Sequence, residues 1–207
     1  MREVYEEREW IYLAESVIVA DGLTKKYGSL TAVDNVSFSV SPGEIFSLVG
    51  PNGAGKTTTV EILECLRSPT DGKAEIFGCS VAEEEEKVKK RIGVMPQEFS
   101  TFERLTVEEN VELISDIEGG SGDLKEIYAD LGLEEERGKS FSELSGGMKR
   151  RAGIAMALAG DPDLVFLDEP TTGLDPQARR DLSTYRKLRA PVVSFKQPMF
   201  ISGRWLY

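Results

Sequence analysis

The chain has 207 residues, of which 40% are hydrophobic and 29% are charged, a composition typical of a soluble globular domain. The net charge of −11 disfavours a surface for duplex nucleic acid, which needs clustered cations, so we expect no nucleic-acid partner. No run approaches the roughly 18 apolar residues that span a bilayer, and residues 1–16 lack the apolar core of a signal peptide. These features predict a protein that is made and kept in the cytosol.

Strands are expected from Val17 onward. Apolar and polar residues alternate over Val36–Val40, as in a half-buried strand, and Ile45–Val49 is a short apolar run typical of a buried strand. The pattern then predicts a helix over Thr57–Leu66, a turn at Asp71-Gly72 and a strand over Ala74–Phe77.

The second half of the chain alternates helices with one more strand. Glu and Lys four residues apart over Glu83–Arg91 indicate a solvated helix, and residues 98–143 are mainly helical and polar, with an interruption at 118–122. A small-residue helix is expected over Ala152–Ala159, and an apolar strand over Leu164–Leu167. Alternating strands and helices predict an α/β fold with a largely parallel sheet.

The first motif is a glycine loop, Gly50 to Thr57, which fits the pattern G-x-x-x-x-G-K-[ST]. Its glycines let consecutive N–H groups point at phosphate oxygens, and the start of the following helix adds a partial positive charge. Lys56 is expected to reach the β- and γ-phosphates of ATP, and the Thr57 hydroxyl suits Mg²⁺.

The second motif is a pair of acids, Asp168 and Glu169, at the end of the apolar strand. Asp168 is expected to hold the Mg²⁺ shell. Glu169 is placed to polarise the water that attacks the γ-phosphate, since a positioned general base contributes roughly 10²–10⁴ in rate. The alternative is an acid pair that caps a strand, which the preceding glycine loop makes improbable.

The third motif, Leu144 to Arg151, places Ser145, Gly146 and Gly147 at the start of a helix. It offers a second hydroxyl and a second anion-binding helix end. Since one nucleotide does not need two such cradles from one subunit, a symmetric dimer fits, in which each cradle closes over the other subunit's ATP. Seen alone, the motif is equally an ordinary turn with a helix N-cap.

In this order the three segments resemble the ATP-binding subunits of ABC transporters, whose signature loop reads Leu-Ser-Gly-Gly-Gln. The resemblance runs from about Val17 to Asp181. Met148 departs from that glutamine and, together with Lys149-Arg150-Arg151, is similar to the daunorubicin-resistance-like exporter branch. It implies an α/β P-loop NTPase fold with a RecA-like core sheet, an antiparallel β subdomain and an inserted α-helical lobe. The implied divisions are an extension over 1–16, an ATPase core over 17–97 and 144–181, the helical lobe over 98–143, and a divergent tail over 182–207.

The resemblance also implies residue roles. Tyr27 resembles the aromatic residue that stacks on adenine, Gln97 the glutamine that senses Mg²⁺ and the γ-phosphate, and Gly173–Pro176 the loop that crosses the dimer interface. The expected catalytic residues are Glu169, Gln97 and Lys56, and the expected metal ligands are Thr57, Gln97 and Asp168. The expected nucleotide-binding residues are Tyr27, Gly50, Pro51, Asn52, Gly53, Ala54, Gly55, Lys56, Thr57, Thr58, Ser145, Gly146 and Gly147.

After Asp181 the likeness fades, so the C-terminal part of the fold is expected to be truncated. The resemblance implies a later strand ending in a switch histidine, but the chain has no histidine, and residues 182–207 carry five cations and no acid. Val192-Val193 loosely resembles that strand, and Gln197 is a weak substitute for the histidine. An ill-fitting strand there would leave backbone groups unpaired inside the sheet, at roughly 1–3 kcal/mol each.

Two interpretations of the tail stay open, a functional variant and a frameshift. Lys196 to Met199 is encoded AAR-CAR-CCN-ATG, and dropping two bases permits Thr-Thr-His. A disrupted gene end is the preferred interpretation.

The preferred function is an ATP-binding subunit that forms a homodimer around MgATP at the inner face of the cell membrane. It would couple ATP hydrolysis to export through a polytopic permease that contacts the helical lobe. Two alternatives stay open: a hydrolysis-deficient remnant of such a subunit, and a soluble ABC-type ATPase that acts on DNA or ribosomes.

Overall fold

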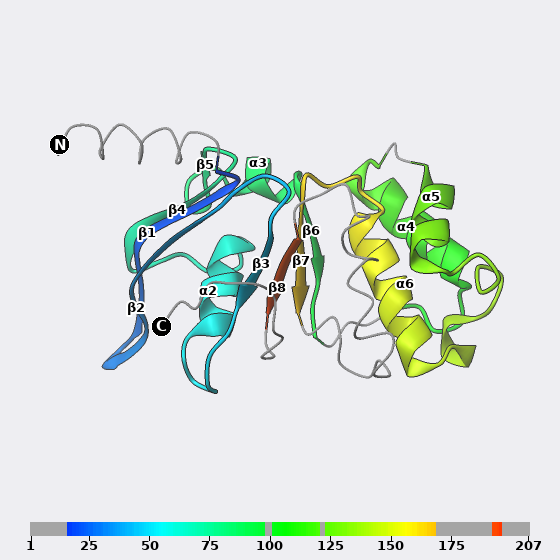
Figure 1. Cartoon of the computed structure of the whole chain (residues 1–207), viewed down its shortest axis with the longest axis horizontal. Coiled ribbons are helices and arrows are strands. Elements are labelled where there is room, and N and C mark those ends of the chain that lie inside the picture. Colours follow the sequence, from blue (N-terminus) through cyan, green and yellow to red (C-terminus); the bar gives the residue numbers. More distant parts are fainter. Residues whose placement is uncertain (1–15, 98–100, 121–122, 169–191, 196–207) are drawn as a thin grey trace.

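The computed structural model describes residues 16–97, 101–120, 123–168 and 192–195. In this part of the chain, an antiparallel sheet and a parallel sheet lie beside a group of helices (Figure 1). None of the helices described has the length and apolar character that a bilayer crossing requires. Residues 1–15 of the predicted extension and most of the divergent tail lie outside the described residues. The predicted truncation of the C-terminal part also falls on residues outside this range.

The antiparallel sheet has the order β2-β1-β4-β5. The alternation predicted in its second strand is confirmed, because Val36, Phe38 and Val40 are buried or half-buried while the serines between them are exposed. The bounds are Ile18–Tyr27 for β1, Leu30–Val40 for β2, Asp71–Ile76 for β4 and Cys79–Ser80 for β5.

The turn predicted at Asp71-Gly72 is wrong, because both residues belong to β4. A Cβ atom on Gly72 would lie 2.2 Å from the carbonyl oxygen of Gly22, and the pairing of β1 with β4 shifts register between Asp21 and Thr24. The glycine therefore permits a close approach between the backbones of β1 and β4 at an irregularity of the sheet.

The parallel sheet has the order β3-β8-β7-β6. Its strands are Ile45–Leu48 (β3), Ile92–Met95 (β6), Leu164–Asp168 (β7) and Val192–Phe195 (β8). All four residues of β8 pair with both β3 and β7. The expectation of unpaired backbone is thus wrong for these residues, since Val-Val-Ser-Phe has the β-branched and aromatic character that suits a strand.

The helices follow the predicted pattern with shifted ends. The helix after the glycine loop stops at Leu63, earlier than expected, and Cys65 adopts a left-handed conformation with φ 57°. In the solvated helix Glu85 pairs with Lys89 as expected, while Lys87 pairs with Glu84. The bounds are Lys56–Leu63 for α2, Glu85–Lys89 for α3, Val107–Glu118 for α4, Leu124–Leu131 for α5, Phe141–Glu143 for the 3₁₀ helix η1 and Gly146–Leu158 for α6.

The lobe helices have clear start and stop signals. Thr106 and Glu109 form a reciprocal capping box at the start of α4, and Gly119 ends it in a left-handed conformation. The predicted interruption near 118–122 is therefore confirmed where the structure describes it, up to Gly120.

Two hydrophobic clusters meet at β7. Leu164 and Phe166 face the cluster that holds α2 and the antiparallel sheet, whereas Val165 and Leu167 face the cluster of α4, α5 and α6. These four side chains are fully buried. Successive strand residues point to opposite faces, so a continuous apolar run is what a sheet covered on both sides requires.

Candidate functional site

The loop between β3 and α2 depends on glycine geometry. Gly53 and Gly55 have positive φ angles of 83° and 78°, which L side chains rarely adopt. A Cβ atom on Gly55 would lie 2.1 Å from the carbonyl oxygen of Ala32 in β2. The loop therefore presses against β2 and leads directly into α2, as the motif predicts.

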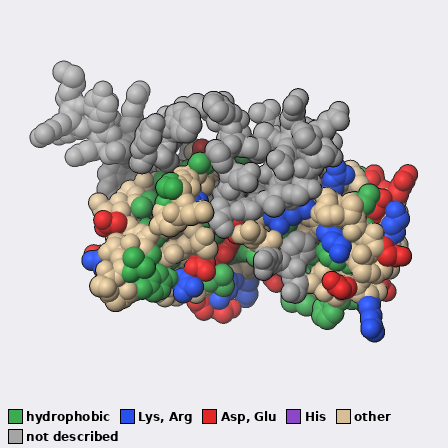
Figure 2. Space-filling model, turned by 90° about the horizontal axis from the view of Figure 1, so that it is seen from below, with side chains coloured by type: hydrophobic (Ala, Val, Ile, Leu, Met, Phe, Trp, Pro, Cys, Tyr) green, Lys and Arg blue, Asp and Glu red, His purple; other side chains and the backbone are tan. Residues whose placement is uncertain are grey.

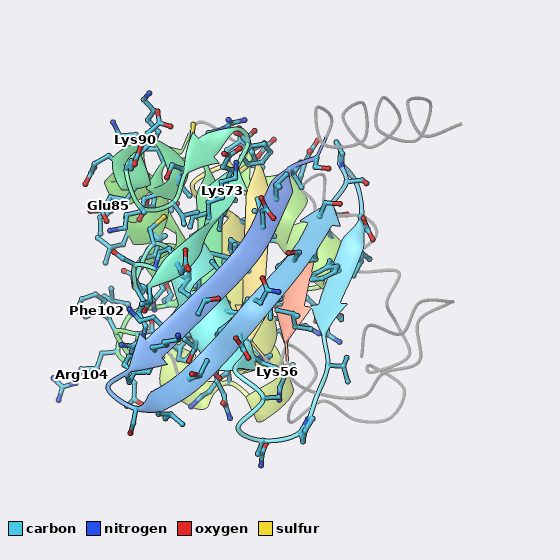
Figure 3. The ribbon with its side chains drawn as sticks, turned by 90° about the vertical axis from the view of Figure 1, so that its left-hand side faces the viewer. Lys56, Lys73, Glu85, Lys90, Phe102 and Arg104 are labelled. Atoms are coloured by element: carbon cyan, nitrogen blue, oxygen red, sulfur yellow. The ribbon has the colours of Figure 1, made fainter. Side chains whose placement is uncertain are left out.

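Lys56 is the buried cation of this loop. Its side chain is 9% exposed, and its Nζ atom lies 2.6 Å from the carbonyl oxygens of both Gly50 and Pro51. Figure 3 shows Lys56 at the end of the molecule opposite Glu85 and Lys90. An ammonium group has three donors, so the loop's own carbonyls hold this charge in place beside the turn.

No side chain of the described residues caps the start of α2. Gly55 occupies the N-cap position and makes no side-chain hydrogen bond to the first turn. The N–H groups of that turn have no partner within a helix, and an anion is a natural partner for them. The remaining predicted residues of the loop lie at this end, with Asn52, Ala54 and Thr57 exposed and Thr58 half-buried.

The third motif forms the start of α6. Ser145 is its N-cap, and its hydroxyl accepts a hydrogen bond of 3.3 Å from the Met148 N–H. Ser145 and Gly146 are exposed, Gly147 is half-buried, and nothing lies within 4 Å of a Cβ atom built on Gly146. This helix end therefore faces open space.

The two helix starts lie at the same end of the molecule but on opposite sides of the parallel sheet (Figure 1). Figure 2 views this end directly and shows charged side chains of both signs over the lobe side. The arrangement fits the inference from the motifs that the two cradles serve different nucleotides.

The ends of β6 and β7 bring two predicted site residues near each other. Gln97 follows β6, Asp168 ends β7, and the two strands pair in parallel from Ile92 with Leu164 to Met95 with Leu167. Gln97 is exposed and Asp168 is half-buried. Glu169 and the Gly173–Pro176 loop lie outside the described residues.

Tyr27 ends β1, at the tip of the hairpin against which the glycine loop packs. Its side chain is 40% exposed. The Lys25 ammonium and the Arg67 guanidinium lie 5.3 Å and 5.7 Å from its ring centroid, and Glu61 forms an ion pair with Arg67. The ring is thus a partly exposed aromatic surface with two cations near it.

A family model described as ABC transporter matches residues 33–172, which include the glycine loop, both strand ends and the start of α6. The chain belongs to the ABC transporter family. Within that family it is an ATP-binding domain with the P-loop ATPase fold, so the predicted family and fold class are confirmed.

Individual relatives agree with this assignment. The chain is 41% identical over 172 residues to the probable multidrug ABC transporter ATP-binding protein YbhF of Escherichia coli, covering 81% of this chain and 30% of the relative. It is 41% identical over 170 residues to the daunorubicin/doxorubicin resistance protein DrrA of Streptomyces peucetius, covering 80% and 52%. The chain thus spans about a third to a half of these relatives, and the predicted likeness to the daunorubicin-resistance branch is confirmed.

A solved structure shows the same fold. A dimeric bacterial ABC transporter cassette superposes with a TM-score of 0.74 and 29% identity, over 86% of this chain and 87% of that one. The described strands and helices of the ABC domain are therefore arranged as in a known cassette.

The fold gives two residues environments that sequence reasoning missed. Glu64, at the end of α2, has its pKa raised to about 7, first by burial and then by the nearby charges of Asp168 and Glu61. Arg150 is buried and donates to the backbone carbonyls of Gln97 and Asp168. The available signal for Arg150 was its helical spacing, since it shares the buried face of α6 with Ile154 and Ala157.

Proposed function

We propose that this chain is the ATP-binding subunit of an exporter, which hydrolyses MgATP within a dimer and drives a membrane partner. The observation that carries the proposal is the pairing of two helix starts at one end of the domain, one open beside the buried Lys56 and one capped by Ser145. The names of these relatives, which concern multidrug transport and drug resistance, support the direction of transport.

The first step is capture of the triphosphate. The backbone N–H groups of the loop and of the start of α2 would bind phosphate oxygens. The Lys56 ammonium, held by two carbonyls at 2.6 Å, would exchange one of these contacts for a phosphate oxygen. Tyr27 would offer its exposed ring to adenine.

The donors proposed for Mg²⁺ are the Thr57 hydroxyl, the Gln97 amide oxygen and the Asp168 carboxylate. These are hard oxygen ligands of the kind that Mg²⁺ prefers, and one carboxylate beside a phosphate is its common arrangement. They fit the ion by chemistry and by their place after β3, β6 and β7 at one edge of the sheet. When bound, the ion neutralises charge on the β- and γ-phosphates.

The hydrolytic step is assigned to Glu169 as general base, which orients and deprotonates the attacking water. Ser145, Gly146 and Gly147 of a second copy would contact the same γ-phosphate through a hydroxyl and through backbone N–H groups. The subunit interface is therefore proposed to complete each site.

The proposed membrane contact is the helical lobe over 98–143, at the inner face of the cell membrane. Support comes from two large apolar side chains of the lobe that face solvent, Phe102 at 62% and Ile117 at 67% exposure. The polytopic permease would cover such a surface.

Two variants test the proposal. Lys56→Ala should abolish MgATP binding measured by equilibrium dialysis, because it removes the charge at the phosphate turn. Glu169→Gln should trap ATP and yield a nucleotide-dependent dimer in sedimentation. Unchanged ATP affinity in the first variant, or monomer alone at saturating MgATP in the second, would contradict the proposal.

A second candidate is an ATP-binding module that hydrolyses slowly, and the absence of histidine from the sequence favours it. Loss of one hydrogen-bond donor to the charge that develops in the transition state typically lowers the turnover rate by a factor of about 10²–10³. Replacing the segment after β8 by one that supplies a histidine should then raise turnover by that factor. Equal turnover in both chains would rule this candidate out.

A further inference from the structure

Arg150 is a buried cation inside the ATPase domain that the motifs do not explain. It is the fifth residue of α6 and is 7% exposed. One terminal nitrogen, Nη1, lies 3.1 Å from the Gln97 carbonyl oxygen, and the other, Nη2, donates to the Asp168 carbonyl oxygen. A buried charge is costly unless it is well hydrogen-bonded, so its place calls for a function.

The two carbonyls belong to the ends of neighbouring parallel strands. Gln97 lies two residues beyond the end of β6, Asp168 is the last residue of β7, and Met95 pairs with Leu167 just before them. The pairing of β6 with β7 ends at Met95 and Leu167. Beyond that point the guanidinium spans the gap between the two chain segments.

The shape of the guanidinium suits this bridge. Its donors form a planar, rigid fork, so two hydrogen bonds from one side chain fix two acceptors relative to each other. A lysine ammonium offers point-like donors on a flexible stem and sets no such spacing. Both bonds go to main-chain carbonyl oxygens, and neither uses a side-chain oxygen of Gln97 or Asp168.

The same side chain is anchored at the start of α6. Ser145 caps this helix five residues before Arg150, and the helix packs against β6 and β7. The bridge therefore links the backbone at two proposed metal ligands to the helix that carries the third motif.

We infer that Arg150 is a positioning residue for Mg²⁺-dependent nucleotide binding, because it holds the backbones of Gln97 and Asp168 where their side-chain oxygens can share one metal ion. The inference rests on the proposed function of these two residues as metal ligands. Loss of a group that orients metal ligands typically lowers metal affinity by 10–100-fold.

The test measures binding of a fluorescent ATP analogue to the full chain, in EDTA and across a Mg²⁺ titration. The variants are Arg150→Lys, Arg150→Met and Asp168→Asn. The matched control is Arg137→Lys, an arginine of the lobe that pairs with Glu108 and lies 4.7 Å from the Tyr128 ring centroid. Melting temperatures of all variants are recorded alongside.

Both Arg150 variants should keep the parent's affinity in EDTA but need 10–100-fold more Mg²⁺ to reach half of the metal-dependent gain, with Met affected more than Lys. Arg137→Lys should retain the parent's Mg²⁺ midpoint. A purely structural role would lower the melting temperature and leave this midpoint unchanged.

Three outcomes decide the matter. A Mg²⁺ midpoint within twofold of the parent in each folded Arg150 variant overturns the inference while the metal site stands. If Arg150→Met does not fold, the Lys variant decides by the same criterion. If Asp168→Asn also keeps the parent's midpoint, the proposed metal site is wrong and the inference falls with it.

Discussion

The starts of α2 and α6 present the same backbone feature in two different states. At α2 the cap is Gly55, with a left-handed backbone and no side-chain hydrogen bond, and the buried Lys56 follows at once. At α6 the cap is Ser145, whose hydroxyl already accepts from the Met148 N–H. The first start leaves its donors open beside a cation, while the second partly satisfies its own.

Under the proposed function, this difference would separate a loop that captures the phosphates from a helix end that contacts them across the dimer interface. A hydroxyl that accepts a hydrogen bond can still donate one, so Ser145 could contact a phosphate while its cap stays in place. Glycine geometry is strict at the first start and relaxed at the second, since a Cβ atom would collide at Gly55 and meet nothing at Gly146.

The largest effect is expected from a matched pair of glycine substitutions. Gly55→Ala combines a positive φ with a Cβ atom 2.1 Å from the Ala32 carbonyl oxygen, and should lower the free energy of unfolding by about 2–5 kcal/mol. Gly146→Ala should change it by no more than about 1 kcal/mol. Urea unfolding of both variants checks this, and equal midpoints would remove the contrast between the two helix starts.

The next effect concerns the end of α2. The pKa of Glu64 is raised from 4.5 to about 7, so the folded state binds more protons than the unfolded state between these values. Stability should therefore fall as pH rises through this window, and the cost should persist above pH 7. Glu64→Gln should remove it, with a gain of up to about 3 kcal/mol at pH 8 and little change at pH 4.

Thermal unfolding in EDTA at both pH values measures this gain. The control is Glu112→Gln, which makes the same chemical change at an exposed position on α4. A Glu64→Gln variant with the same stability as the parent at every pH would show that the half-buried carboxyl carries no such cost.

The smallest stability effect separates capping from ligand binding at α6. Ser145→Ala and Thr106→Ala each remove a side-chain cap, of α6 and α4, and each should cost about 1 kcal/mol. Only Ser145→Ala should also weaken the ATP-dependent dimer trapped by Glu169→Gln, as seen by sedimentation. Equal dimer loss in both variants would assign the effect to helix stability alone.

The sequence by itself determined the features that depend on near neighbours. The glycine loop with Lys56, the alternation in β2 and the fully apolar β7 follow from spacing and turn chemistry within a few residues. Together with the acid pair and the loop at Leu144 to Arg151, they predict the ABC family and its α/β fold by resemblance, while the roles of the site residues stay predictions.

Only the tertiary structure decided which residues depend on distant segments of the chain. Arg150 reaches carbonyls 53 and 18 residues away in sequence, Glu64 acquires its raised pKa from burial near Asp168, and Gly72 is required by the backbone of Gly22. Each of these three features depends on the distance between two segments that are far apart in the sequence. Local periodicity does not predict that distance. A buried arginine, an acid at a helix end and a glycine after an aspartate each have an ordinary local explanation, so packing alone showed their roles.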